Sequence, residues 1–312
     1  MKTMHAGTGE AAGGGVGLRR LGRTELQVSE VGLGGAWLLG RRGEGDLAAG
    51  AEIVCRALEL GVNYIDTAEC YIGGRSERVV GEGLRQGQGA REGCTVATKF
   101  GHVPKAFDFR ARSVLESLQR SLEALGLARL DVFQLHTPAE PAWDLLAGPD
   151  GAFEGLRQAK ARGLVRFLGI TGRDVDFLVR CIETDLFDTA LIFTRFNAVE
   201  QSAEPFFRAA AEHDVGVIVA GPLYGGLLGS ARDERMSRAA SAVQSRVRTL
   251  EALALAAGIS LPEMALRFIL SHRAAACTLC GSADISELEG SIAAAARGPL
   301  PAALVEAIRG LR

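Results

Sequence analysis

The chain is organised around the stretch Val62-Asn63-Tyr64-Ile65-Asp66-Thr67-Ala68-Glu69-Cys70-Tyr71-Ile72-Gly73-Gly74-Arg75-Ser76-Glu77. An apolar run ends in Asp66, Tyr71 follows five residues later, and a glycine pair precedes a helical pattern. This order predicts a strand, a loop and a helix, with ionisable side chains at the carboxyl end of the strand. In an α/β barrel, that end of each strand carries the chemistry. The rest of the chain should supply the groups that this segment lacks.

The same succession of apolar run, loop and helical stretch recurs along the whole chain. Neighbouring runs are mostly about 25 to 35 residues apart, the length of a βα unit. Continuously apolar strands between helices favour a parallel sheet, and eight such units favour a closed barrel. We therefore predict an α/β fold, a (β/α)8 TIM barrel over residues 17–312, with an N-terminal β-hairpin from Leu18 to Val28. The eight runs begin at or near Glu30, Val62, Cys94, Asp131, Val165, Thr189, Val215 and Ala275.

Composition narrows the classes of function. The chain has 312 residues, of which 47% are hydrophobic, and a formal net charge of −2. This balance gives no electrostatic reason to expect a nucleic acid or an anionic membrane as partner. No apolar run approaches the roughly 20 residues that span a bilayer. Residues 1–16 are rich in Gly and Ala without an apolar core, so we expect a disordered leader and not a signal peptide.

The cysteines indicate a reducing environment. Six are scattered along the chain, which fits reduced thiols in a cytoplasmic enzyme. Cys277 and Cys280 form a CxxC pair, but no second pair or nearby histidine completes a zinc site, so we predict no metal. We interpret this pair as buried or lining thiols, with a redox or metal role as the alternative. We interpret Cys70 as a passive thiol, with an oxidation-sensitive switch as the alternative.

Four ionisable residues lie at or just after the ends of three successive predicted strands. Asp66 and Tyr71 follow the second strand, Lys99 ends the third and His136 ends the fourth. Each residue alone has an ordinary structural explanation, such as a capping acid, a rim charge or a packing aromatic. Because consecutive barrel strands are neighbours, all four side chains can meet at one mouth, and their joint occurrence predicts an active site.

These residue types suit one kind of chemistry. A phenol has a pKa of about 10, and a nearby ammonium lowers that pKa by stabilising the phenolate. A carboxylate keeps the ammonium charged and in place. An imidazole beside the phenol can hold a carbonyl oxygen by a hydrogen bond. The set fits protonation of an oxygen while a hydride from a bound cofactor reaches the carbon.

From Leu18 to the C-terminus, the chain resembles the aldo-keto reductase family. Asp66-Thr67-Ala68-Glu69-Cys70-Tyr71, followed by the segment from Gly74 to Gly81, resembles the family's DTAxxYG…SE…G signature. Thr98-Lys99-Phe100-Gly101 resembles its TKFG motif, and the segment from Gly221 to Gly229 resembles its SPLGRGLLTG loop. The resemblance implies a barrel that binds an extended nicotinamide dinucleotide, NAD(P)(H), without a Rossmann fold. No GxGxxG fingerprint follows the first strand, as that implication requires.

The resemblance also implies roles for individual residues. Tyr71 is the general acid in reduction and the base in oxidation, Lys99 tunes Tyr71, Asp66 pairs with Lys99, and His136 orients the carbonyl. Aromatic residues of the expected mouth loops are candidates for the substrate wall: Trp37, Phe100, Trp143 and Tyr224. Cofactor contacts carried over motif by motif fall on Gly35, Ala36, Trp37, Thr171, Gly172, Gly221, Pro222, Leu223, Gly225, Leu227, Gly281, Ser282, Asp284, Glu287 and Ser291.

Some positions depart from the family pattern. Thr171-Gly172 replaces a common Ser-Asn, and Phe193 replaces a common Gln, so ring stacking or apolar contact would substitute near the nicotinamide. The loop after the eighth strand carries Asp284 and Glu287 in place of basic residues. Because a carboxylate repels a 2′-phosphate but accepts hydrogen bonds from a ribose diol, we hypothesise that NAD is used at least as readily as NADP. In the alternative, Glu287 points to solvent and an arginine such as Arg273 or Arg297 supplies the charge.

The predicted function is that of an NAD(P)-dependent oxidoreductase that interconverts a carbonyl (aldehyde, ketone or aldose) and an alcohol. The segment from Phe167 to Gly172 also resembles the sugar-dehydrogenase branch of the family, so one alternative is an NAD-dependent aldose 1-dehydrogenase that forms a lactone. Another is a non-catalytic, nucleotide-sensing regulatory subunit. The expected partner is a small carbonyl or sugar molecule, while the individual substrate and the oligomeric state stay open.

Overall fold

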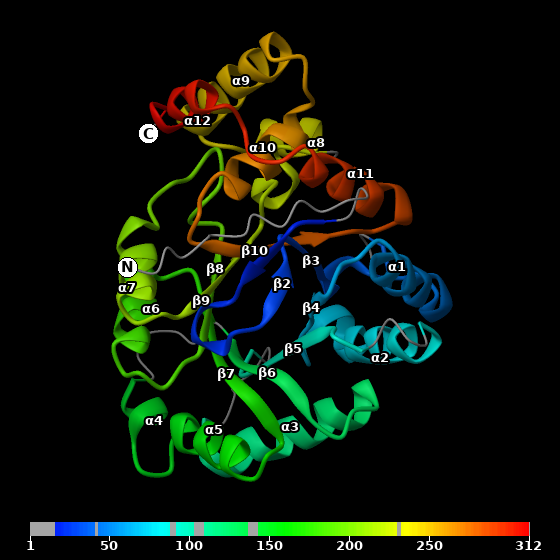
Figure 1. The fold of residues 1–312 in the computed structure, drawn as a ribbon, viewed down its shortest axis with the longest axis vertical. Coiled ribbons are helices and arrows are strands. Elements are labelled where there is room, and N and C mark those ends of the chain that lie inside the picture. The colour runs from blue at the N-terminus through cyan, green and yellow to red at the C-terminus, as the bar shows by residue number, and fades with distance from the viewer. Residues whose placement is uncertain are drawn as a thin grey trace, which may run out of the picture.

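The computed structural model describes residues 16–40, 43–87, 92–102, 109–136, 143–229 and 232–311. Apart from Val16, the expected leader lies outside these residues. Eight parallel strands close into a barrel in chain order (Figure 1), which confirms the predicted (β/α)8 fold. The strands are β3 (Val31–Gly34), β4 (Tyr64–Asp66), β5 (Thr95–Phe100), β6 (Leu130–His136), β7 (Val165–Gly172), β8 (Thr189–Phe193), β9 (Gly216–Ala220) and β10 (Ala275–Gly281).

A layer of helices surrounds the barrel (Figure 1). One main helix follows each strand: α1 (Leu47–Glu59), α2 (Ser76–Gln86), α3 (Ala111–Leu125), α5 (Ala152–Ala161), α6 (Val175–Ile182), α7 (Glu204–Glu212), α10 (Leu261–Leu270) and α11 (Ile285–Ala296). The others are α4 (Trp143–Ala147), α8 (Arg232–Met236), α9 (Ser241–Ala256) and α12 (Ala302–Arg309).

The apolar positions that recur at helical spacing in the sequence form the buried face of a helix in the structure. On α3, Val114, Leu118 and Leu122 are buried against the barrel, and Gly126 ends the helix in the left-handed conformation at φ +68°. Among the described residues, no single helix is long and apolar enough to cross a membrane. The bent pair of α9 and α10, at an angle of 93°, meets that test by length and composition only.

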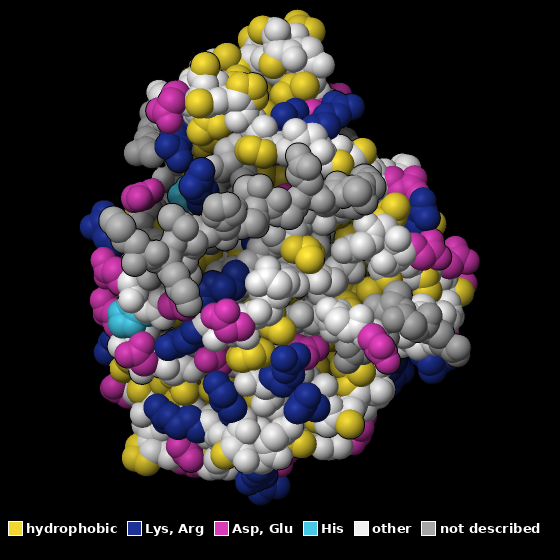
Figure 2. Space-filling view, in the orientation of Figure 1, with side chains coloured by type: hydrophobic (Ala, Val, Ile, Leu, Met, Phe, Trp, Pro, Cys, Tyr) yellow, Lys and Arg dark blue, Asp and Glu magenta, His cyan; other side chains and the backbone are white. Residues whose placement is uncertain are grey.

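The predicted hairpin closes one end of the barrel. Strands β1 (Leu18–Arg20) and β2 (Gln27–Ser29) pair antiparallel, and Leu21 and Val28 are fully buried in the barrel interior. Figure 1 shows this hairpin lying across the barrel. On the same face, basic and acidic side chains are intermixed (Figure 2), and Arg20 pairs with Asp214 at 2.5 Å. The mouth that can hold a site is therefore at the opposite end, where the strands terminate.

Candidate active site

The carboxyl ends of β4, β5 and β6 bring the four predicted ionisable residues together. Asp66 is the last residue of β4, Lys99 is next to last in β5, and His136 is the last residue of β6. Tyr71 opens a short 3-10 turn, η3 (Tyr71–Gly74), in the loop after β4. The parallel register sets Lys99 beside Gln134 on the neighbouring strand. The loop residue Tyr71 thus lies above a group of side chains that three adjacent strands hold in fixed positions.

Lys99 and Asp66 form a buried ion pair at the centre of this group. The Lys99 ammonium donates to Oδ1 of Asp66 and, at 2.8 Å, to the backbone carbonyl of Thr67. Both residues are only 2% exposed. Burial lowers the pKa of Lys99, but the charge and the hydrogen bond of Asp66, with a smaller contribution from Tyr71, outweigh burial and raise that pKa overall. The lysine therefore carries a full positive charge, held within the barrel.

Gln134 is a member of the group that the motifs did not reveal. Its Nε2 donates to Oδ2 of Asp66 at 2.8 Å, and the side chain is fully buried. Gln134 lies two residues before His136 on β6, so both side chains face the same side of the strand. That spacing is the signal that could have identified it. With one oxygen facing Lys99 and the other facing Gln134, the Asp66 carboxylate has a single orientation.

Tyr71 stands against the ammonium. The Nζ atom of Lys99 lies 4.8 Å from the centroid of the Tyr71 ring. Burial raises the pKa of the Tyr71 phenol, and Lys99 opposes that rise without reversing it. The sequence-based expectation of a lowered pKa is therefore wrong in its net direction, because the cost of burying a phenolate exceeds the stabilisation by the cation. Tyr71 keeps its proton, as a proton donor requires.

His136 completes the group as a neutral ring. Its centroid lies 5.6 Å from that of Tyr71 in an edge-on arrangement and 5.2 Å from that of His102. Burial, together with the nearby Lys99 and His102, lowers the pKa of His136 to about 2. At neutral pH the ring has one N–H to donate and one bare nitrogen. The Cys70 sulfur lies 3.6 Å from Nδ1 of this ring.

Hydrogen bonds anchor the loop that carries Tyr71 to α3 on one side and to the backbone of Gly35 on the other. Glu69 accepts hydrogen bonds from Ser117 at 2.5 Å and from Arg120 at 2.7 Å, both on α3. Ser76 donates to the backbone carbonyl of Gly35 at 2.8 Å. Directly after Tyr71, Ile72 adopts the left-handed conformation at φ +52°, which is strained for a β-branched residue. The backbone at the phenol is therefore held in one conformation by its neighbours.

The predicted cofactor residues lie at the ends of four other strands, around the same mouth. Gly35, Ala36 and Trp37 form a 3-10 turn after β3, and Thr171 and Gly172 end β7. Further members follow β9 (Gly221, Pro222, Leu223, Gly225 and Leu227) or lie at and after the end of β10 (Gly281, Ser282, Asp284 and Glu287), while Ser291 lies within α11.

The hydroxyl of Ser282 is the observation in this structure that bears on whether these residues could bind a dinucleotide. The Ser282 side chain is buried, and its Oγ has no hydrogen-bond partner within the described part of the chain. A buried hydroxyl without a partner is costly. Its position among the predicted cofactor residues fits a hydrogen bond to a ligand.

The two acids after β10 form a helix cap. Oδ1 of Asp284 accepts from the backbone N–H of Glu287 at 2.9 Å, and Oε2 of Glu287 accepts from the backbone N–H of Ala283 at 3.0 Å. Asp284 is the N-cap of α11, and Glu287 reaches one residue further back than in a capping box, so both side chains satisfy backbone N–H groups at the start of the helix. Glu287 is thus folded back onto the helix end, which places two carboxylates at that end of the mouth.

The candidate aromatic residues of the substrate wall have different surroundings. Phe100 is 1% exposed and stacks on Phe133 at 4.8 Å in the outer core, so its assignment to the wall is wrong. Trp143 packs edge-on against Phe177 of α6 at 6.1 Å, which ties it to the helix layer, and its substrate role stays a prediction. Trp37 is 42% exposed at the mouth. Tyr224 is partly exposed in the loop after β9.

Phe193 is exposed at the mouth in the place where the family often carries Gln. Its side chain is 40% exposed, and the Arg173 guanidinium lies 5.7 Å from its ring centroid. An aromatic face is therefore available at the end of β8, as the sequence comparison with the family required.

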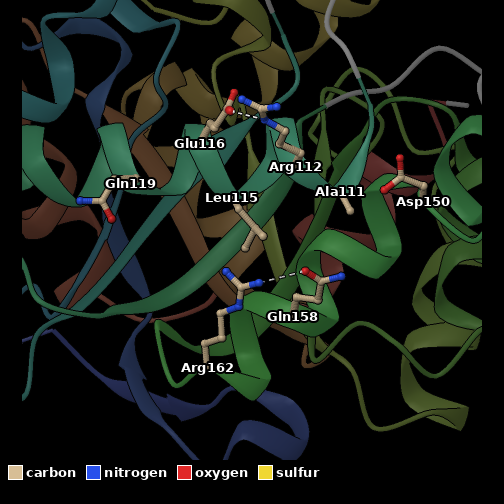
Figure 3. Close-up of a pocket in the computed structure, with 8 residues that line it drawn as sticks. All are labelled: Ala111, Arg112, Leu115, Glu116, Gln119, Asp150, Gln158 and Arg162. Carbon is tan, nitrogen blue, oxygen red and sulfur yellow. Dashed lines mark hydrogen bonds and ion pairs between the residues drawn. The ribbon is translucent and has the colours of Figure 1, made fainter.

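A separate surface hollow of about 460 Å³ lies between α3 and α5 (Figure 3). Three of the charged side chains that line it are engaged with other lining residues, since Arg112 donates to Glu116 at 2.7 Å and Arg162 donates to Gln158 at 3.3 Å. We do not include it in the site. Across the described ranges, no cluster of three or more His, Cys, Asp or Glu residues could hold a metal ion. Cys277 and Cys280 are buried free thiols.

Comparisons with known proteins show similarity to one family of enzymes. Residues 30–312 match the model of the aldo/keto reductase family. L-galactose dehydrogenase of Arabidopsis thaliana is 30% identical over 89% of this chain and 87% of its own length. D-threo-aldose 1-dehydrogenase of a Pseudomonas species is 27% identical over 74% of this chain and 78% of its own. The holo form of an aldo-keto reductase from Bacillus halodurans superimposes with a TM-score of 0.78 at 26% identity, covering 95% of this chain and 96% of that one.

Proposed function

Because this chain belongs to the aldo/keto reductase family of oxidoreductases, we propose that it interconverts a carbonyl and an alcohol by NAD(P)-dependent hydride transfer. The observation that carries the proposal is the buried pair of Lys99 and Asp66 beside a protonated Tyr71 and a neutral His136. We assign this activity to a single barrel domain over residues 17–312, acting on a small molecule in the cytoplasm.

The four side chains divide the proton chemistry among them. When bound at the mouth, the nicotinamide supplies the hydride in reduction and accepts it in oxidation. Tyr71 gives its proton to the carbonyl oxygen in reduction and takes it back in oxidation. The Lys99 ammonium stabilises the phenolate that remains, and Asp66 holds that ammonium in place. His136 donates its one N–H to the same oxygen and so fixes the carbonyl beside the phenol.

Residues around the mouth would hold the cofactor in an extended form. The backbone turns after β3 and β9 and the end of β7 would line it, and Ser282 would offer its hydroxyl. Phe193 would give the nicotinamide an aromatic face in place of the common Gln. The positive end of the α11 dipole would attract the 2′-phosphate of NADP, but the capping acids Asp284 and Glu287 add negative charge at the same place. We therefore propose that NAD is used at least as readily as NADP.

Sugars are the substrate class that we favour. Two relatives bear names that specify sugar oxidation, L-galactose dehydrogenase and D-threo-aldose 1-dehydrogenase. In that reaction the anomeric carbon of a cyclic aldose would give its hydride to the oxidised nicotinamide, and Tyr71, once it has lost its own proton to solvent, would take the proton of the anomeric hydroxyl. The product is a lactone, the two electrons leave with the hydride, and the net change releases one proton to solvent.

A two-direction screen tests the proposed function. Purified protein is assayed with NAD and NADP on a panel of aldoses, and with the reduced cofactors on a panel of aldehydes and ketones. We expect lactone formation from at least one aldose. Turnover of simple aldehydes alone would exclude the sugar proposal but keep the oxidoreductase. Binding of reduced cofactor, seen by fluorescence, without turnover in either direction would instead favour the nucleotide-sensing regulatory subunit.

A further inference from the structure

Cys70, the residue immediately before Tyr71, contacts the Nδ1 atom of the His136 ring. The Cys70 sulfur lies 3.6 Å from Nδ1 of His136, within hydrogen-bond distance for sulfur. Among the described residues, Cys70 is the side chain that reaches this nitrogen. Tyr71 and His102 contact the ring through their own rings, and Lys99 contributes a nearby positive charge. Cys70 and His136 therefore form a thiol–imidazole pair inside the candidate active site.

Protonation states decide which partner donates in this pair. Burial raises the pKa of the Cys70 thiol, with Lys99 opposing, so the sulfur keeps its proton at neutral pH. The pKa of His136 is lowered to about 2, so the ring is neutral and one of its nitrogens is bare. A bare imidazole nitrogen is a good acceptor, whereas sulfur is a weak one. The favourable arrangement has the S–H donating to Nδ1, which leaves the ring proton on Nε2.

We propose that Cys70 is a positioning residue that fixes the tautomer of His136 and so keeps a proton on Nε2 for the substrate oxygen. This inference rests on the proposed function, because the tautomer matters only if His136 donates to a carbonyl or alcohol oxygen. In the opposite tautomer, Nε2 would be bare and would face the lone pairs of that oxygen. Cys70, which the sequence indicated as a passive thiol, would thus help to orient the substrate through His136.

Nitrogen NMR of the full-length protein, labelled with 15N-histidine, reads the tautomer directly. A bare and a protonated ring nitrogen differ strongly in chemical shift, and the His136 signals are identified by their loss in His136→Asn. We expect wild-type His136 with a bare Nδ1 and a protonated Nε2, and the same state in Cys70→Ser, which keeps a donor. In Cys70→Ala, we expect the signals to move toward a mixture of tautomers. Protonated Nδ1 in the wild type, or unchanged signals in Cys70→Ala, would overturn the proposal.

Turnover by the same variants links the tautomer to function. One neutral hydrogen bond is worth about 0.5–1.5 kcal/mol, so we expect kcat/KM to fall about two- to tenfold in Cys70→Ala and to recover in Cys70→Ser. Cys55→Ala is the matched control, because Cys55 is a partly exposed thiol on α1 that contacts the carbonyl of Gly83. A fall in Cys70→Ala without a change of tautomer contradicts the proposal. If no substrate is turned over, the proposed function fails, whereas the NMR result still decides the tautomer.

Discussion

At the scale of single residues, the central feature is a carboxylate whose two oxygens are both engaged. Asp66 accepts from Lys99 on one oxygen and from Gln134 on the other, entirely within the barrel. Space for the Gln134 side chain comes from Gly169 on β7, where a β-carbon would lie 2.6 Å from Cγ of Gln134. Gln134 therefore shares with Lys99 the task of holding the Asp66 carboxylate, which gives it an indirect influence on the lysine.

Gln134→Leu tests this indirect role. The variant keeps the bulk of the side chain but leaves Oδ2 of Asp66 buried without its donor, which costs about 1–3 kcal/mol of stability. We expect a lower denaturation midpoint and a drop of about tenfold in kcat, with a much smaller change in the Kd of the cofactor, because one tenth of the rate corresponds to about 1.4 kcal/mol. Gln158→Leu, a variant of the partly exposed α5 residue, is the control. Unchanged kcat in Gln134→Leu would remove the positioning role.

The lowered pKa of His136 predicts a stability change at acidic pH. An unfolded histidine titrates near 6.5, whereas folded His136 stays neutral down to about pH 2. Below pH 6.5 the unfolded chain therefore binds a proton that the folded chain refuses, and stability falls as the pH is lowered. At pH 5 this residue should cost up to about 2 kcal/mol of unfolding free energy.

Urea unfolding of wild type and His136→Asn at pH 7 and pH 5 measures this cost. We expect the variant to lose less stability than the wild type over that interval. Some acid sensitivity remains in both proteins, because burial also lowers the pKa of His272. Equal losses in the two proteins would mean that folded His136 accepts its proton at an ordinary pH.

Among the helices, α11 begins with two acids that cap it and that we propose to influence the choice of cofactor. Glu287 and Asp284 cap the helix, and their charges lie where the resemblance places the adenosine ribose. Glu287→Gln keeps an oxygen acceptor for the N–H of Ala283 but removes one charge. We expect kcat/KM with NADP to rise about three- to tenfold and that with NAD to change little, since one charge a few ångströms away is worth about 1 kcal/mol in water.

The matched control lies on the same helix. Glu289 pairs with Arg56 of α1 at 2.7 Å, so Glu289→Gln removes the same charge from α11 at another position. Its ratio of NAD to NADP efficiency should equal that of the wild type. A hundredfold preference of the wild type for NADP would contradict the proposed role of the acids.

The elements themselves could be predicted from the sequence because their periodicity is strong. Apolar runs of strand length located all eight barrel strands, and the residue types at their ends located Asp66, Lys99 and His136. The error at Phe100 came from ignoring strand alternation, since Lys99 faces the interior and its neighbour must face the helices. Loop geometry was beyond reach, because a β-branched residue such as Ile72 has no intrinsic preference for the left-handed conformation that it adopts. The contact between Cys70 and His136 depends on that loop.

At the scale of the whole molecule, stability and chemistry occupy opposite ends of the barrel. The hairpin places Leu21 inside the closed end, and Arg19 fixes it by donating to the carbonyl of Leu270 at 2.7 Å. The side chains that we propose to react are at the other end. Conservative changes at the closed end should therefore affect folding and leave the chemistry intact.

Leu21→Ala measures this separation. Removing a fully buried leucine costs about 2–5 kcal/mol, so the urea midpoint should fall clearly. The fraction that remains folded at low temperature should keep the kcat of the wild type within about twofold, since within the described part of the chain Leu21 shares no hydrogen bond or ion pair with the candidate site, and distant sites act nearly independently. A large loss of kcat in fully folded Leu21→Ala would show that the two ends are coupled.

If the Tyr71 phenol passes the proton during hydride transfer, its removal must slow that step, and the single-turnover rates of paired tyrosine variants measure this. Tyr64 is a fully buried tyrosine on β4 whose hydroxyl has no recorded partner among the described residues, so Tyr64→Phe removes a phenol oxygen without touching the proton path. The rate of cofactor oxidation or reduction is followed by stopped-flow absorbance with saturating substrate. We predict a loss of at least about a hundredfold in Tyr71→Phe, with nearly unchanged cofactor binding, and little loss in Tyr64→Phe. A Tyr71→Phe protein that transfers hydride at the wild-type rate would contradict the account.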